Sequence, residues 1–247
     1  MAIKIKIDGR ECLCEKGEYI YDIAKRNGIE IPTYCRSDAF PDHRACCRMC
    51  IVEVVQRGRS RIVASCVYPV DGECEVLTAS PRILEDRAVL RALIKQTEDE
   101  AEGVEFQRLA QIENDKCILC GLCVQACESL GTGAISLVNR GVDKDVDTPY
   151  LKPNKACVGC LSCANVCPMD AITWSETETT RSIWHREFQL ARCSCCGKVL
   201  GTVDSLEYSR KKSGKQAKSV PLETTYLCDE CRKEALAREM RETYRLV

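Results

Sequence analysis

Two cysteine runs with the same spacing could hold redox metal clusters. They are Cys117-x2-Cys120-x2-Cys123-x3-Cys127 and Cys157-x2-Cys160-x2-Cys163-x3-Cys167. A [4Fe–4S] cubane presents its iron atoms on a small tetrahedron, so three thiolates from one tight loop can bind three of them. The fourth iron needs a thiolate from elsewhere in the chain. The spacing favours [4Fe–4S] clusters over disulfides or zinc, because zinc sites commonly use two separated pairs of ligands.

The two runs, and Pro168 after the second, resemble those of bacterial two-cluster ferredoxins. In that family the last cysteine of each run binds the cluster of the other run. The resemblance implies that one cluster is bound by Cys117, Cys120, Cys123 and Cys167. It implies that the other is bound by Cys157, Cys160, Cys163 and Cys127. The residues after Cys127, ESLGTGAI, look instead like the ferredoxin insert of iron-only hydrogenases and NAD-dependent formate dehydrogenases.

The composition indicates a metal-rich chain from a reducing compartment. The 247 residues include 21 cysteines and only 5% aromatic residues, so ordinary core-forming side chains are scarce. The first residues alternate apolar and charged without a signal-peptide pattern, and no apolar run is long enough to cross a bilayer. We therefore expect a cytoplasmic protein in which metal clusters replace part of a hydrophobic core. The net charge of −1 argues against nucleic acid as the main partner.

A third set of cysteines lies in the first third of the chain. Around it, the pattern predicts a β-hairpin at 3–15, a short helix at 19–27 and a strand at 51–55. The set is Cys35, Cys47, Cys50 and Cys66. A close pair with one cysteine upstream and one downstream suits a [2Fe–2S] cluster, in which each iron takes two thiolates. Cys46 competes with Cys47, and the C-x2-C pair directly before the strand favours Cys47.

Three segments carry a second resemblance: IPTYC at 31–35, CRMCIVEV at 47–54 and ASCVYPV at 64–70. They resemble the N-terminal β-grasp [2Fe–2S] domain of the large iron–sulfur subunit of respiratory complex I and of related NAD-linked hydrogenase and formate dehydrogenase subunits. Those relatives often carry a further [4Fe–4S] cluster after this domain, bound by one histidine and three cysteines. Residues 81–116 contain neither residue type, so we expect a different route between the first domain and the next.

Two C-x2-C knuckles near the end of the chain form a fourth set: Cys193, Cys196, Cys228 and Cys231. Each knuckle presents two thiolates, and together they make a tetrahedral site for one metal ion, as in zinc ribbons. We predict strands at 200–206 and 224–227 for the ribbon and a charged helix at 230–244. Zinc is favoured over a further iron site, which would use the same S4 ligation. Cys195 falls outside the knuckle register.

These sites divide the predicted chain, of α+β class, into four segments. They are a β-grasp [2Fe–2S] ferredoxin-like domain at 1–80, a helical linker at 81–112, a 2×[4Fe–4S] bacterial-type ferredoxin domain at 113–176, and a zinc-ribbon-like domain with a C-terminal helix at 177–247. The linker helix is expected to begin at Ser80-Pro81, with serine as N-cap and proline in the first turn.

The sequence offers several one-electron sites and no residue set for chemistry on a substrate. It has no Walker loop, no dinucleotide fingerprint and only two histidines. We therefore expect an electron-transfer chain that is not catalytic by itself. The resemblance implies a hetero-oligomeric, soluble complex in which the chain connects a flavin NAD(P)(H)-reactive subunit to a hydrogenase catalytic subunit, with electron bifurcation as one variant. The alternatives are the same role in an NAD-dependent formate dehydrogenase and a free-standing ferredoxin-like carrier.

Overall fold

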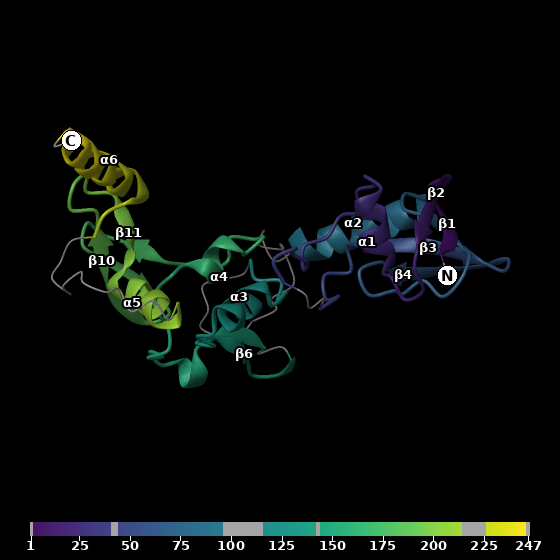
Figure 1. Cartoon of the computed structure of the whole chain (residues 1–247). Helices are drawn as coiled ribbons and strands as arrows, with labels where there is room; N and C mark the ends of the chain where they lie inside the picture. The colour runs from purple at the N-terminus through teal and green to yellow at the C-terminus, as the bar shows by residue number, and fades with distance from the viewer. Residues whose placement is uncertain (1, 41–43, 96–115, 142–143, 214–225, 246–247) are drawn as a thin grey trace.

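The computed structural model arranges the chain as three parts in sequence order (Figure 1). It describes residues 2–40, 44–95, 116–141, 144–213 and 226–245. Within these residues the three parts contain a five-stranded, a two-stranded and a four-stranded sheet, respectively. No helix in the described ranges is both long enough and apolar enough to cross a bilayer.

The N-terminal sheet is built from alternating segments. Its elements, with the helix that covers it, are β1 Ile3–Ile7, β2 Arg10–Cys14, α1 Ile20–Arg26, β3 Ile51–Gln56, β4 Arg59–Ala64 and β5 Glu75–Leu77. The strand order is β2-β1-β5-β3-β4, with β1 and β5 parallel and the other neighbours antiparallel. Ile5 and Ile7 of β1 share one buried cluster with Ile20 and Ile23 of α1. The predicted hairpin, helix and strand are confirmed.

Helix α2, Pro81–Lys95, begins where the sequence predicts. The backbone N–H of Ile83 donates to Ser80 Oγ at 3.4 Å, which is the expected capping contact. Arg87 is buried, and its guanidinium donates to the carbonyl oxygens of Met49 (3.1 Å) and Ile51 (2.6 Å). These bonds hold α2 against the cysteine loop that precedes β3. Residues 96–112 of the predicted linker lie outside the described residues.

The middle part repeats one local arrangement. Its elements are α3 Leu122–Leu130, β6 Ser136–Val138, β7 Asp145–Asp147, the 3₁₀ turn η2 Pro149–Leu151 and α4 Ser162–Asn165. Helix α3 follows Gly121 (φ 74°) and α4 follows Leu161 (φ 61°), both in the left-handed region. Each of these residues comes directly after the second cysteine of its run. The backbone therefore repeats together with the cysteine spacing.

The C-terminal part carries a second antiparallel sheet. Its elements are β8 Ser175–Glu176, β9 Thr180–Ile183, β10 Arg186–Arg192, β11 Val199–Thr202, α5 Val203–Lys212 and α6 Asp229–Arg245. The strand order is β11-β10-β9-β8. The predicted C-terminal helix is confirmed as α6.

The strands predicted for a zinc ribbon are present only in part, and β11 supplies residues 200–202 of the first. β11 ends at Thr202, and residues 203–206 are helical because Thr202 Oγ1 accepts a hydrogen bond from Ser205 N (3.1 Å) and caps α5. Residues 226 and 227 of the second predicted strand belong to no strand, while 224 and 225 lie outside the described residues. The second knuckle instead opens helix α6.

Candidate iron–sulfur and metal sites

The first cysteine set is gathered and buried around the ends of β3 and β4. Cys35, Cys47, Cys50 and Cys66 each expose 9% or less of their surface. Cys50 precedes β3 and Cys66 follows its antiparallel partner β4, so the pairing of the two strands brings these sulfurs within 3.3 Å. The backbone N–H of Tyr34 donates to Cys47 Sγ at 3.4 Å.

The thiols of this group differ in how readily they lose a proton. The hydrogen bond between Cys50 and Cys66 lowers the pKa of Cys50 to about 6 and raises the pKa of Cys66. A hydrogen bond with Cys35, followed by burial, raises the pKa of the Cys47 thiol. Iron must therefore displace protons when it binds here, as metals do at thiol sites generally.

Cys46 lies at the edge of this buried group, and a hydrogen bond with Cys35 lowers the pKa of its thiol. Its thiol is exposed and donates to the carbonyl oxygen of Cys120 at 3.6 Å. We therefore expect Cys47→Ser to abolish the [2Fe–2S] signal, because a serine oxygen is a poor ligand for iron that prefers thiolate. Cys46→Ser is the matched control and should leave the signal unchanged. Electron paramagnetic resonance (EPR) of the dithionite-reduced protein measures both, and the opposite pattern would assign the ligand to Cys46.

The first cysteine loop packs directly on the middle part of the chain. Cys35, Cys47 and Met49 form one buried cluster with Cys120 and Leu122. A side chain on Gly121 would meet the Arg44 side chain at 2.9 Å, which shows how closely the two loops approach. The first cysteine set and the first cysteine run are therefore in contact, with no further metal site between them among the described residues.

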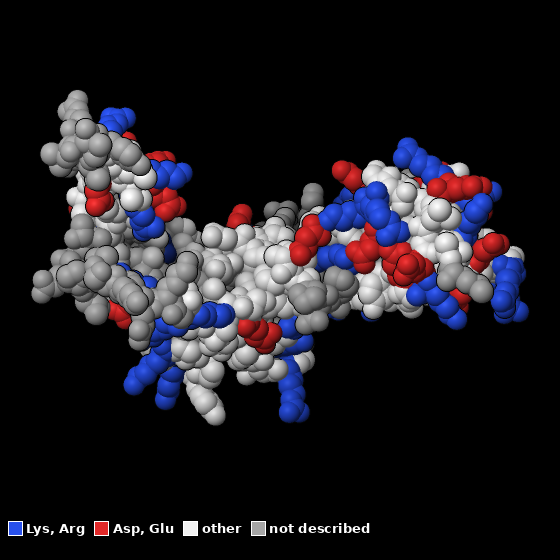
Figure 2. All heavy atoms as spheres, in the orientation of Figure 1, with Lys and Arg blue, Asp and Glu red and all other residues white. Residues whose placement is uncertain are grey.

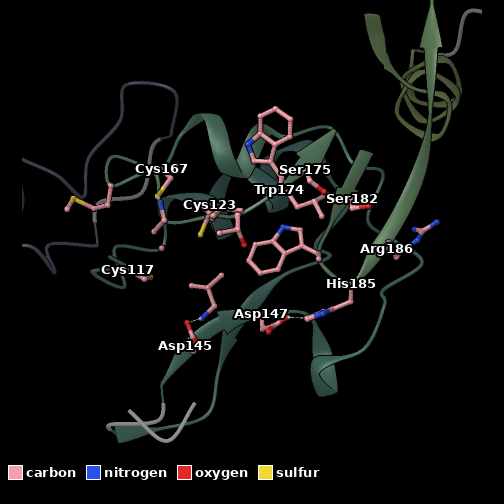
Figure 3. Close-up of a pocket in the computed structure, with 18 of the residues that line it drawn as sticks. Cys117, Cys123, Asp145, Asp147, Cys167, Trp174, Ser175, Ser182, His185 and Arg186 are labelled. Carbon is pink, nitrogen blue, oxygen red and sulfur yellow. Dashed lines mark hydrogen bonds and ion pairs between the residues drawn. The ribbon is translucent and has the colours of Figure 1, made fainter. Parts of the chain in front are cut away.

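A cavity of about 680 Å³ lies beside the first run. It is lined by all three closely spaced cysteines of that run and by Cys167 of the second. Figure 3 shows Cys117, Cys123 and Cys167 at one side of this space, with Trp174 and His185 at the other. The backbone N–H of Ala171 donates to Cys167 Sγ at 3.3 Å.

A second, smaller cavity gathers the remaining four cysteines of the two runs. Cys157, Cys160 and Cys163 line it together with Cys127 of the first run. Cys127 Sγ accepts a hydrogen bond from the Ala134 backbone N–H and shares one with the Thr132 hydroxyl, both 3.1 Å long. Each cavity is thus lined by three cysteines of one run and by the last cysteine of the other, which is the arrangement that the ferredoxin resemblance implies.

Both cavities fit a cubane on the chemistry of their donors. Burial raises the pKa of Cys120 to about 11, of Cys123 to about 12 and of Cys163 to about 11. These thiols are neutral near pH 7 without metal, and ligation to iron would deprotonate them. Three thiols from one loop and one from the opposite loop, partly satisfied by N–H donors, are the set that a [4Fe–4S] cluster requires.

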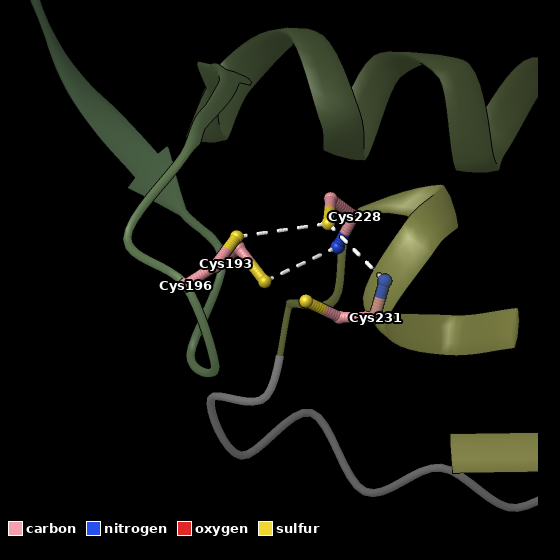
Figure 4. Close-up of side chains that lie close together, drawn as sticks. All are labelled: Cys193, Cys196, Cys228 and Cys231. Carbon is pink, nitrogen blue, oxygen red and sulfur yellow. Dashed lines mark hydrogen bonds between the residues drawn. The ribbon is translucent and has the colours of Figure 1, made fainter. Parts of the chain in front are cut away.

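The fourth cysteine set also converges. The sulfur atoms of Cys193, Cys196, Cys228 and Cys231 all lie within 4.8 Å of one another (Figure 4). The Cys196 and Cys228 sulfurs are 3.7 Å apart, close to the roughly 3.8 Å edge of a tetrahedron with Zn–S bonds of about 2.3 Å. Hydrogen bonds from the backbone N–H groups of Cys196 and Cys228 lower the pKa of Cys193 to about 6. The group can hold one tetrahedral metal ion.

Two domain models match the chain. A 2Fe-2S iron-sulfur cluster binding domain matches residues 1–81, and a 4Fe-4S dicluster domain matches residues 110–174. The HndD component of an NADP-reducing hydrogenase from Solidesulfovibrio fructosivorans is 31% identical over 215 residues, or 70% of this chain. The chain is an iron–sulfur protein related to NAD(P)-linked hydrogenase subunits.

Other relatives of this iron–sulfur protein belong to neighbouring enzyme systems. The alpha subunit of an NADPH-Fe(3+) oxidoreductase of Geobacter sulfurreducens is 27% identical over 67% of this chain, and the gamma subunit of NAD-reducing hydrogenase HoxS of Cupriavidus necator is 23% identical over 60%. The chain spans only 36% of HndD and 23% of the Geobacter protein, but 76% of HoxS gamma. A chain of a crystal structure of NAD+-reducing [NiFe]-hydrogenase in the H2-reduced state superposes with a TM-score of 0.49 at 24% identity, over 60% of this chain and 75% of that chain.

The sequence of this iron–sulfur protein did not lead us to predict two contacts beside the second cavity. Trp184 Nε1 donates to Cys163 Sγ at 3.3 Å, and Arg181 Nη1 donates to the Gly159 carbonyl oxygen at 2.9 Å. Both come from β9 and its turn, beyond the end of the dicluster match. The alternation of buried and exposed residues along β9 and β10 is the sequence feature that could have predicted this hairpin.

Proposed function

We propose that this chain relays electrons through one [2Fe–2S] and two [4Fe–4S] clusters. Cys35, Cys47, Cys50 and Cys66 would bind the first. Cys117, Cys120, Cys123 and Cys167 would bind the first cubane, and Cys157, Cys160, Cys163 and Cys127 the second. Bound iron supplies the one-electron chemistry. The residues of the chain hold the thiolates, exclude water and donate hydrogen bonds to sulfur.

The continuity of the three cysteine groups carries this proposal. The first group contacts the first run through Cys35, Cys47 and Cys120. The two cubane cavities in turn share Ile183 and Trp184 as lining residues. Neighbouring redox centres in contact along one chain suit electron transfer between two ends of the molecule. Residues 81–116 contain no histidine or cysteine that could hold a further cluster. The contact between the two cysteine loops would therefore be the direct route for electrons between the first and the middle part.

The proposed partners are a flavin NAD(P)(H)-reactive subunit and, at the other end, a hydrogenase catalytic subunit in the cytoplasm. The names of HndD and HoxS gamma support this choice, because both are subunits of hydrogenases that reduce NADP or NAD. The surface agrees with assembly. Figure 2 shows a mostly uncharged face over the middle part, between charged ends. In the middle part Tyr150 and Leu151 are 90% and 57% exposed, as expected for apolar side chains that a partner covers.

Reduction by a nicotinamide cofactor tests the function directly. The tagged chain, purified without oxygen from its native cells, is expected to bring a flavoprotein with it. NADH or NADPH should then reduce the clusters of the complex, measured by EPR, and should not reduce those of the isolated chain. Hydrogen or formate as reductant distinguishes the two terminal enzymes. Elution of the chain alone with all clusters, reducible by several unrelated enzymes, would identify a free carrier and contradict the proposal.

Metal analysis checks the number of sites. We expect about ten iron atoms per chain, from two plus four plus four, together with about one zinc in the C-terminal cysteine group. Acid-labile sulfide should match the iron. About fourteen irons without zinc would assign a further cubane to Cys193, Cys196, Cys228 and Cys231, and colourless protein without sulfide would contradict the relay.

A further inference from the structure

The turn between β9 and β10 has an unusual sequence for its shape. Ile183 pairs with Arg186, so Trp184 and His185 alone form the turn. Both are in the left-handed region, with φ of 51° and 61°. Two-residue turns with positive φ at both positions favour asparagine and glycine, because a large side chain is strained there. Strained residues persist where surrounding contacts over-determine them, often at functional sites.

Both side chains of the turn make specific contacts with the middle part. Trp184 Nε1 donates to Cys163 Sγ at 3.3 Å, and the indole lines both cubane cavities. His185 Nε2 lies 3.2 Å from Asp147 Oδ1, a carboxylate that is 6% exposed. The strained turn thus places the indole beside a proposed ligand of the second cubane.

The strands on either side hold the turn firmly in place. Arg186 donates to the carbonyl oxygen of Cys157 at 2.6 Å and to that of Asn154 at 3.2 Å. On the same loop Thr202 donates to the Val158 carbonyl oxygen, and Arg181 to that of Gly159. The loop of the second cysteine run is therefore bonded to the C-terminal sheet at several successive carbonyls, and the indole position is fixed relative to Cys163.

We propose that Trp184 is a positioning residue that raises the reduction potential of the second [4Fe–4S] cluster by holding an N–H donor on Cys163, a role that rests on the ligand assignment proposed above. One-electron reduction places additional negative charge on the thiolate sulfurs. An N–H that donates to such a sulfur stabilises the reduced form more than the oxidised form, which is how hydrogen bonds tune these clusters. The C-terminal sheet would thereby contribute to the difference in reduction potential between the two cubanes.

Trp184→Phe tests the proposal because it keeps an aromatic ring and removes the donor. In an EPR-monitored redox titration of the whole chain, the second cubane is the signal that Cys160→Ser removes. At the potential where the wild-type second cubane is half reduced, its reduced-to-oxidised ratio should fall about tenfold in Trp184→Phe, which is about 59 mV for a one-electron couple. Trp174→Phe is the matched control and should leave this potential unchanged, since Trp174 does not line the second cavity and phenylalanine keeps an aromatic ring beside Arg181.

A nitrogen-15 measurement keeps the test decisive even where Trp184→Phe does not assemble. The chain has two tryptophans, so ¹⁵N-tryptophan labels only Trp184 in the Trp174→Phe protein. Pulsed EPR of the reduced second cubane should then show a ¹⁵N coupling and a proton coupling that is lost in D2O. An unchanged potential in Trp184→Phe, or the absence of a ¹⁵N coupling, overturns the proposed role of Trp184. If that protein keeps its iron and all three cluster signals, the proposed electron relay is not affected by this result. Missing clusters in the wild-type protein would count against the relay itself.

Discussion

Cys160→Ser is expected to remove the second [4Fe–4S] cluster and leave the other two. Iron should fall from about ten to about six atoms per chain, since one cubane carries four. A serine oxygen is a poor substitute for thiolate at iron, and Cys160 is only partly buried, so its replacement creates little strain in the fold. EPR of the reduced protein should lose one cubane signal and keep the [2Fe–2S] signal. Electron flow from NAD(P)H through the complex should drop to background.

Cys195→Ser is the matched control, because Cys195 is exposed and lines neither cavity. It should leave iron content and all signals unchanged. The crossed ligation gives a sharper form of the same test. Cys127→Ser should remove the signal that Cys160→Ser removes, although Cys127 belongs to the first run. Should it instead remove the signal that Cys117→Ser removes, each run would hold its own cluster.

Features set by short-range spacing were predictable from the sequence. The β1–β2 hairpin follows from alternation around a turn, and the start of α2 follows from Ser80 and Pro81. The grouping of the two cysteine runs also follows from local loops, because three thiols within seven residues are close enough to share one site. The choice of the fourth cysteine required a family resemblance. In the structure Cys167 lines the cavity beside the first run, and Cys127 lines the cavity of the second run.

Features set by packing between distant segments were not predictable in this way. The contact of Cys46 with Cys120 joins residues 74 positions apart, and no local pattern encodes it. The turn at Trp184 and His185 carries none of the residues that mark such turns, because its conformation is imposed by contacts with the second cysteine loop. The strand predicted at 200–206 for a zinc ribbon continues only to Thr202, because Thr202 as a cap and Asp204 in the first turn favour a helix from residue 203.

Gly159→Ala is expected to loosen the C-terminal sheet from the second cluster loop. A Cβ at Gly159 would lie 2.7 Å from Phe188 Cδ2 and 3.0 Å from Thr202 Cγ2, closer than real contacts allow. Phe188 is 2% exposed and Thr202 is fully buried, so neither side chain can move away freely. Overpacking of this kind costs about 1–3 kcal/mol, in addition to about 1–2 kcal/mol for alanine at a left-handed φ of 64°.

Gly133→Ala separates these two contributions, because Gly133 has a φ of 53° and no atom within 4 Å of its would-be Cβ. It should carry the backbone strain alone. At about 2–4 °C per kcal/mol for a chain of this size, Gly159→Ala should lower the thermal midpoint by several degrees more than Gly133→Ala. The midpoint is best followed by loss of the second cubane signal, since the sheet and that loop are predicted to separate together. Equal midpoints in the two variants would mean that the C-terminal sheet does not bear on the cluster loop, and the tuning role of Trp184 would lose its structural basis.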